Sequence, residues 1–171
     1  MDKGENRPIY VGLGGNLAHP RYGPPMATLR AALAQLAGRG VEIQRVSPWY
    51  RSAPVPPSDQ PWYFNAVVEV GADLSANQLL AVLHAIESKF GRVRNAANAP
   101  RAIDLDLLDF RGEIAAGGRD KATLPHPRLA ERAFVLLPLA DLAPNWRHPA
   151  SGKPISELIA ALPADQRAER V

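Results

Sequence analysis

The order of strand-type and helix-type patterns constrains the fold of this chain more than any other feature. Apolar or alternating runs predict strands at residues 9–13, 41–46, 63–70 and 102–110. A 3.6-residue apolar spacing predicts one helix with Pro24 and Pro25 at its start and a second that Ser75 caps. The order is therefore β-α-β-β-α-β, which predicts a ferredoxin-like α+β sandwich with one antiparallel sheet.

The remaining segments extend this order without adding a second domain. The chain has 171 residues, the usual size of one domain, so we expect residues 1–171 to form a single domain with a flexible start at 1–8. Prolines between 48 and 61 predict a long, restricted loop. Residues 125–142 are predicted to be helical in pieces, interrupted by Pro138, and a short helix follows at 155–162, so the C-terminal tail is helical.

Several classes of protein are excluded by what the sequence lacks. Without cysteine there is no disulfide scaffold, no cysteine nucleophile and no thiolate zinc site. The longest charge-free apolar run, 133–140, is too short for the ~20 residues of a membrane span. Residues 1–8 contain no apolar segment of a secretory signal. We therefore expect a cytoplasmic protein with no membrane partner. A monomer is expected as well, although none of these features bears on oligomeric state.

Arginine makes up most of the basic side chains, 16 of 20, and concentrates between residues 89 and 132. The planar guanidinium binds phosphate or carboxylate with two hydrogen bonds at once, so this segment is a candidate anion site. A GC-rich genome, which favours arginine over lysine, explains the same bias without any function.

Asp104 and Asp106 are the most specific chemical signal. In a strand, residues i and i+2 point to one face, roughly 6.5–7 Å apart, while Leu105 and Leu107 point into the core. Two adjacent carboxylates in an apolar strand repel each other, and a bound cation relieves that repulsion. Ligands that are all oxygen favour Mg²⁺. Asp109 has the opposite parity, so we expect it not to be a ligand; a solvated edge strand is the alternative explanation for the pair.

Basic residues flank the paired carboxylates on both sides. Arg92, Arg94 and Arg101 bracket the aperiodic loop that precedes the strand, and His126 and Arg132 follow it. Arginines beside a carboxylate-bound metal suit a polyphosphate, because the metal bridges phosphate oxygens while guanidinium groups take the remaining charge. A histidine between prolines also fits a purely structural role.

Tyr63 and Asn65 form a second constellation. Both lie on one face of the predicted strand, which places a stacking ring beside an amide that donates and accepts hydrogen bonds. This pair suits a flat heterocycle with polar edges. An aromatic core strand with a structural asparagine is the simpler alternative.

Taken in order, these motifs resemble the 6-hydroxymethyl-7,8-dihydropterin pyrophosphokinase family. The resemblance runs from about residue 9 to residue 144 and is carried by residues 10–16, 47–65, 91–94, 100–106 and 125–134. It implies a ferredoxin-like sandwich that transfers pyrophosphate from MgATP to the hydroxymethyl group of the pterin. The products would be AMP and the pterin diphosphate, in folate biosynthesis.

The resemblance also implies a role for individual residues. Asp104 and Asp106 would hold two Mg²⁺ ions, and Arg92 and Arg101 would complete the catalytic set by closing over the phosphates. The implied ATP-binding residues are His84, Glu87, Arg94, Leu107, Lys121, Thr123, His126 and Arg132. The implied pterin-binding residues are Ser52, Pro54, Val55, Tyr63, Asn65 and Phe134.

Two other functions fit part of the pattern. RNA-recognition domains share the β-α-β-β-α-β order, and a pI of about 9.5 suits nucleic acid. However, neither candidate surface strand carries the basic-glycine-aromatic motif, and Asp104 and Asp106 would repel phosphate without a metal. A catalytically dead paralogue that only binds is disfavoured by the intact carboxylates. We expect ATP and the pterin as partners, and no nucleic acid.

Overall fold

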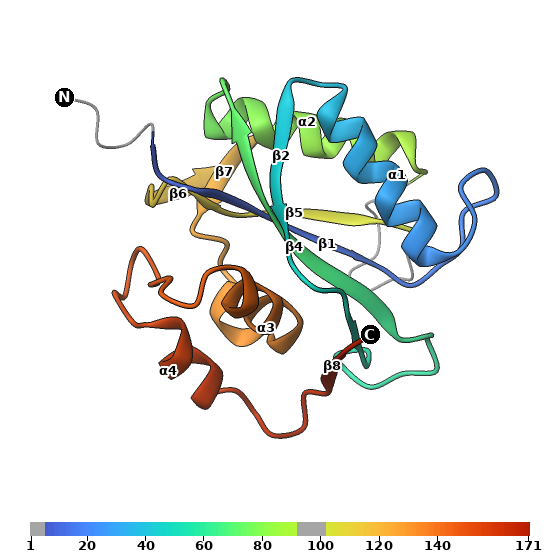
Figure 1. Cartoon of the computed structure of the whole chain (residues 1–171). Helices are drawn as coiled ribbons and strands as arrows, with labels where there is room; N and C mark the ends of the chain where they lie inside the picture. The colour runs from blue at the N-terminus through green and yellow to red at the C-terminus, as the bar shows by residue number, and fades with distance from the viewer. Residues whose placement is uncertain (1–5, 92–101) are drawn as a thin grey trace.

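A computed structural model describes residues 6–91 and 102–171 of the chain (Figure 1). The strands are β1 (Ile9–Gly15), β2 (Val41–Val46), β3 (Tyr50–Ser52), β4 (Tyr63–Ala72), β5 (Asp104–Phe110), β6 (Ala115–Gly118), β7 (Lys121–Leu124) and β8 (Ala168–Arg170). The helices are α1 (Pro25–Ala37), α2 (Ala76–Lys89), the 3-10 turn η1 (Leu129–Glu131), α3 (Ala133–Leu142) and α4 (Ile155–Ala160). The fold is mixed α+β, as predicted.

The main sheet is antiparallel and runs in the order β5-β1-β4-β3-β8, with β2 also paired to β4. β4 is long enough to pair with β2 near its C-terminal end and with β3 near its start. Between these two strands, Ser47 exchanges hydrogen bonds with Val67: its backbone N–H donates to the carbonyl, and its hydroxyl accepts the N–H. The segment between β2 and β3 therefore stays hydrogen-bonded to β4.

Helices cover both faces of the sheet and create two apolar cores (Figure 1). α1 and α2 lie on one face, where Leu29, Leu83 and Leu105 belong to one buried cluster. α3 and α4 lie on the other face, where Leu136 and Leu139 belong to the second. Of the residues described, none forms a helix that is both long and apolar enough to cross a membrane.

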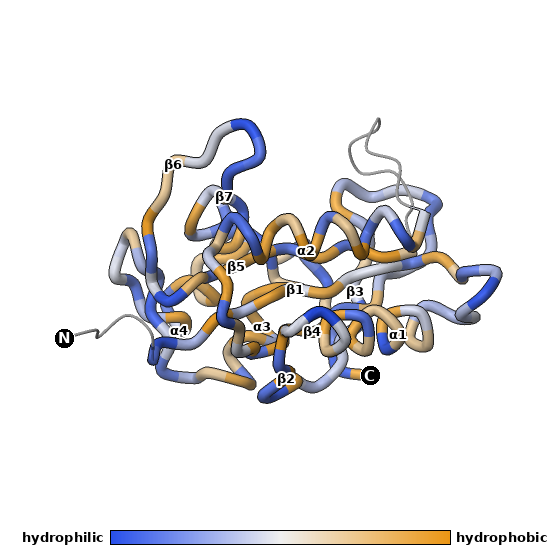
Figure 2. The backbone as a smooth tube through the Cα atoms, turned by 90° about the horizontal axis from the view of Figure 1, so that it is seen from above, coloured by the Kyte–Doolittle hydropathy of each residue, from blue (hydrophilic) through white to orange (hydrophobic). Residues whose placement is uncertain are grey.

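Local sequence signals explain where the two sheet-covering helices begin. Ser75 caps α2 through its hydroxyl, which accepts the backbone N–H of Gln78, and the Gln78 side-chain oxygen accepts the backbone N–H of Ser75. Pro25 opens α1, where its missing N–H costs no helical hydrogen bond. Figure 2 shows hydrophilic and hydrophobic residues alternating along α2, as expected of a helix with one buried face.

Three expectations from the sequence need correction. α3 continues through Pro138, because this proline is buried and apolar packing offsets its missing hydrogen bond. A second, two-stranded sheet, β6-β7, accompanies the main one. β3 and β8 were also not predicted, since strands of three residues are too short to show a period.

Candidate active site

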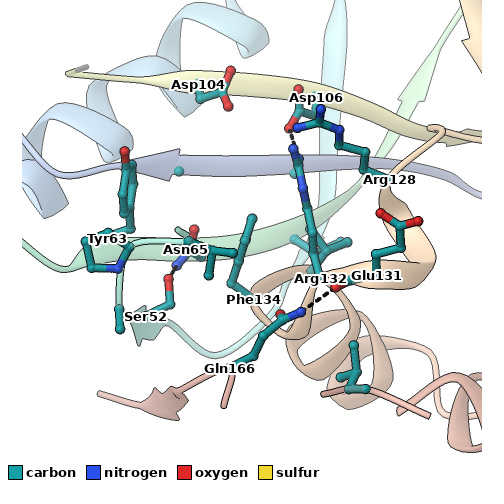
Figure 3. Close-up of a pocket in the computed structure, with 18 of the residues that line it drawn as sticks. Ser52, Tyr63, Asn65, Asp104, Asp106, Arg128, Glu131, Arg132, Phe134 and Gln166 are labelled. Carbon is teal, nitrogen blue, oxygen red and sulfur yellow. Dashed lines mark hydrogen bonds and ion pairs between the residues drawn. The ribbon is translucent and has the colours of Figure 1, made fainter. Parts of the chain in front are cut away.

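One cavity of about 630 Å³ opens on the sheet face that carries α3. It is lined by residues of β1, β3, β4 and β5, by the turn into α3, and by the segment after α4. Figure 3 shows the carboxylates of β5 at one end and the Tyr63, Asn65 and Phe134 side chains at the other. Residues more than 60 positions apart in sequence therefore share one space.

The strand register sets the distance between the two ends of the cavity. Asp104 pairs with Gly14 of β1, and Gly14 pairs with Asn65 of β4, so the three residues form one row across the sheet. Strands are spaced by about 4.8 Å, which places the backbones of Asp104 and Asn65 about 10 Å apart. A Cβ on Gly14 would lie 3.0 Å from the Asn65 Oδ1. Glycine at this position therefore keeps the floor of the cavity open.

Asp104 and Asp106 lie on the cavity face of β5, as predicted, and Leu105 and Leu107 are buried on the other face. No group of three or more histidine, cysteine, aspartate or glutamate side chains within residues 6–91 and 102–171 could hold a metal. Proteins nevertheless often bind Mg²⁺ with only one or two carboxylate ligands, because the ion keeps water ligands and shares the oxygens of substrate phosphates. The donor chemistry of the pair therefore fits this ion.

Asp109 departs from the predicted alternation. The register of β1 and β5 shifts so that Tyr10 pairs with Asp109 while Val11 pairs with Leu107, which turns Asp109 to the face of Asp106. The parity argument was therefore wrong about the face. Its carboxylate accepts the indole N–H of Trp146 at 2.8 Å and the backbone N–H of Gly112 at 2.9 Å. Burial raises the pKa of Asp109.

Arg132 and His126 both approach Asp106. The Arg132 Nη1 lies 3.7 Å from Asp106 Oδ2, and the His126 Nε2 lies 3.8 Å from Asp106 Oδ1. Burial, reinforced by the positive charge of Arg132, lowers the pKa of His126 to about 4. His126 Nδ1 accepts the backbone N–H of Arg128 at 3.1 Å, so we assign the proton of the neutral ring to Nε2, on the side of Asp106.

The opposite end of the cavity is built around Asn65, which is buried. Its Nδ2 donates to the Ser52 hydroxyl at 2.7 Å, which fixes the orientation of the amide. Tyr63 donates its hydroxyl to Gln60 Oε1 at 3.1 Å, and Phe134 enters the cavity from the first turn of α3. Pro54 and Val55 complete this wall. All six residues predicted to bind the pterin therefore line one cavity.

The predicted ATP-binding residues are more scattered, and within this set only Arg132 lines the cavity among the residues described. Glu87 is buried in α2 and accepts the Leu105 backbone N–H at 3.0 Å, so it anchors the strand between the two aspartates. The Leu107 side chain is buried toward α2, which leaves its backbone on the outer edge of β5. Lys121 and Thr123 are exposed on β7, and His84 is partly buried on α2. Arg92, Arg94 and Arg101 lie outside the described residues, as do residues 1–5 of the predicted flexible start.

Sequence reasoning missed several residues that line the cavity. Arg128, Glu131 and Gln166 all contribute to its wall. Gln60 also lines it and accepts a hydrogen bond from Asn16 at 3.1 Å, which ties the loop before β4 to the end of β1. Arg128 could have been found from the dense arginine segment, but Gln166 belongs to no motif.

The arrangement defines a class of protein. Paired carboxylates with an arginine, beside a pocket that offers two aromatic rings and an oriented amide, are typical of an enzyme that transfers a phosphoryl-type group to a small heterocycle. A family model described as 7,8-dihydro-6-hydroxymethylpterin-pyrophosphokinase matches residues 10–144. The chain belongs to this family.

Individual relatives agree with that assignment. The chain is 45% identical over 150 residues to a 2-amino-4-hydroxy-6-hydroxymethyldihydropteridine pyrophosphokinase of Synechocystis sp., covering 87% of this chain and 73% of the relative. It is 42% identical over 156 residues to the Pseudomonas aeruginosa protein of the same name, covering 91% of each chain. A crystal structure of a Plasmodium falciparum HPPK-DHPS triple mutant shares the fold, with a TM-score of 0.67 at 14% identity over 94% of this chain. The present chain spans 45% of that longer one.

Proposed function

We propose that this chain transfers pyrophosphate from MgATP to the hydroxymethyl group of 6-hydroxymethyl-7,8-dihydropterin, giving AMP and the pterin diphosphate in folate biosynthesis. The observation that carries the proposal is that one cavity has an oriented amide at one end and paired carboxylates at the other, on strands whose backbones lie about 10 Å apart. That separation accommodates a bicyclic pterin whose hydroxymethyl group points toward the phosphates.

At the pterin end, Tyr63 and Phe134 stack on the two faces of the ring. Asn65 binds the polar edge of the pterin, and the backbone of residues 52–55 binds beside it. The Ser52 hydroxyl accepts one amide proton of Asn65, so the amide is oriented before the substrate arrives. This preorganisation lowers the entropic cost of binding.

At the phosphate end, Asp104 and Asp106 would hold two Mg²⁺ ions, which would supply positive charge to the phosphates of ATP when bound. Arg132 adds positive charge beside Asp106. The neutral His126 donates from Nε2 toward the same region, where it can bind a phosphate oxygen. Arg92 and Arg101, which precede β5 in sequence, supply the remaining charge when the substrates are bound.

The nucleotide lies along the outer edge of β5. Among the described residues no strand pairs with this edge, and the backbone of Leu107 is available there to the adenine. β7, which carries Lys121 and Thr123, and α2, which carries His84, both contact β5, and Arg94 precedes β5 in sequence. Glu87 contributes indirectly in this proposal: its carboxylate accepts the Leu105 backbone N–H and so fixes the position of β5.

The finer architecture belongs to the same proposal. β5-β1-β4-β2 is the strand order of a ferredoxin-like sandwich, to which α3, α4 and β8 add a largely helical C-terminal tail. One domain is proposed because both cores share the same central sheet, and a monomer is proposed with it.

The products of the reaction test the proposal. Purified protein is incubated with ATP, Mg²⁺ and 6-hydroxymethyl-7,8-dihydropterin, and nucleotides are separated by anion exchange. We expect AMP and the pterin diphosphate in equal amounts, and no AMP when the pterin or Mg²⁺ is left out. ADP as the product, or AMP that does not depend on the pterin, would contradict the proposal.

A further inference from the structure

The segment after α4 forms part of the cavity wall, although the family model ends at residue 144. Leu162, Pro163 and Gln166 face the cavity from this segment. Its position is fixed by β8, where Ala168 pairs with Ser52 and the Ala53 N–H donates to the Arg167 carbonyl at 3.0 Å. The segment is therefore attached to the strand that carries one wall of the pterin pocket.

Gln166 connects this segment to the start of α3. Its Nε2 donates to the Glu131 carbonyl at 2.6 Å (Figure 3), and its Oε1 accepts the Ala133 N–H at 2.8 Å. One side chain thus binds the peptide units on both sides of Arg132. Arg132 is the N-cap of α3 and makes no capping hydrogen bond with its own side chain, so Gln166 provides the cap from a distant part of the chain.

The backbone that Gln166 holds carries two residues with different tasks. The Arg132 guanidinium lies 3.7 Å from Asp106, at the phosphate end, and 5.4 Å from the centroid of the Phe134 ring, at the pterin end. Arg132 and Phe134 are two positions apart and can shift together if the first turn of α3 moves. A small displacement of this turn would therefore disturb phosphate and pterin at once.

We propose that Gln166 is a positioning residue, which holds the first turn of α3 so that Arg132 and Phe134 align the phosphate chain with the pterin. This inference rests on the proposed function. The inference predicts that position 166 requires an amide, because glutamine both donates and accepts, glutamate only accepts, and leucine does neither.

The test compares Gln166→Leu and Gln166→Glu with wild type, and uses Asp165→Ala as the matched control. Asp165 is the exposed neighbour of Gln166 and does not line the cavity. Measured well below the melting temperature, Gln166→Leu should lower kcat by about 10-fold and weaken pterin binding by about 10-fold, as expected for two lost hydrogen bonds. Gln166→Glu keeps the bond to the Ala133 N–H and should recover part of the pterin affinity, whereas Asp165→Ala should match wild type.

Each outcome bears on the inference. If Gln166→Leu lowers the melting temperature but leaves kcat and the pterin Kd within about twofold of wild type, Gln166 is merely structural and the inference is wrong. If that variant does not fold, Gln166→Glu decides alone: a reduced kcat supports the inference and an unchanged one overturns it. Wild-type protein that forms no AMP would instead refute the proposed function.

Discussion

Replacing Asn65 with alanine should weaken pterin binding while leaving the binding of a nucleotide alone almost unchanged. Asn65 is 3% exposed and its amide is already oriented by the Ser52 hydroxyl at 2.7 Å. Its loss leaves the polar edge of a desolvated pterin without partners, which costs about 1–3 kcal/mol, or roughly 5- to 150-fold in Kd. The nucleotide is proposed to bind at the edge of β5, two strands away, so its affinity should change by less than about twofold.

Calorimetry on the same protein samples measures both affinities, with the pterin as one ligand and a non-hydrolysable ATP analogue with Mg²⁺ as the other. Ser52→Ala is the matched control, because it keeps the Asn65 amide and removes only the group that orients it. We expect a smaller loss of pterin affinity for Ser52→Ala, about 2- to 10-fold. Equal losses for the two ligands in Asn65→Ala would mean that Asn65 only supports the sheet, and would refute the reasoning.

Three further predictions concern the other end of the site. Asp104→Asn and Asp106→Asn should each reduce AMP formation by at least about 10³-fold, because each removes a charged metal ligand; near-normal AMP formation by either variant would remove the metal assignment. The pKa of His126 is lowered to about 4, so between pH 6.5 and 4 the unfolded chain binds a proton that the folded one does not, and stability must fall as the pH falls through this range. Urea unfolding without Mg²⁺ measures the free energy of unfolding at pH 7 and at pH 4.5. Between these pH values wild type should lose roughly 2–3 kcal/mol more of this free energy than His126→Gln. Equal losses in the two proteins would show that the histidine is not held neutral. Glu87→Ala should cost about 1–3 kcal/mol of unfolding free energy, because the buried Leu105 N–H loses its acceptor; a change below about 0.5 kcal/mol would mean that water replaces the carboxylate.

Much of the fold follows from periodic patterns that the sequence contains. The apolar runs at 9–13 and 63–70 gave β1 and β4, and Ser75 gave the start of α2, because both signals arise from neighbouring residues. β3 and β8 have no such signal. They are strands because β4 offers a free edge to residues 50–52, and residues 50–52 then offer one to β8.

In the site, too, features set by neighbouring residues could be predicted and features set by distant parts of the chain could not. Alternation along β5 correctly placed Asp104 and Asp106 on one face, but it failed at Asp109, because a register shift against β1 depends on the partner strand. Leu107 and Glu87 were assigned to the nucleotide by resemblance, and that assignment stays a prediction; both side chains are buried, which their place in the sequence did not indicate. Gln166 could not have been predicted, since its two hydrogen bonds reach residues 33 and 35 positions earlier.

The central claim is that one cavity holds the pterin beside metal ions bound by Asp104 and Asp106. Anomalous diffraction from a crystal of the ternary complex with Mn²⁺, a non-hydrolysable ATP analogue and the pterin tests it most directly. The account predicts two anomalous peaks that share the carboxylates of Asp104 and Asp106, with the pterin between Tyr63 and Phe134. Peaks away from both aspartates, or a pterin bound outside this cavity, would contradict it.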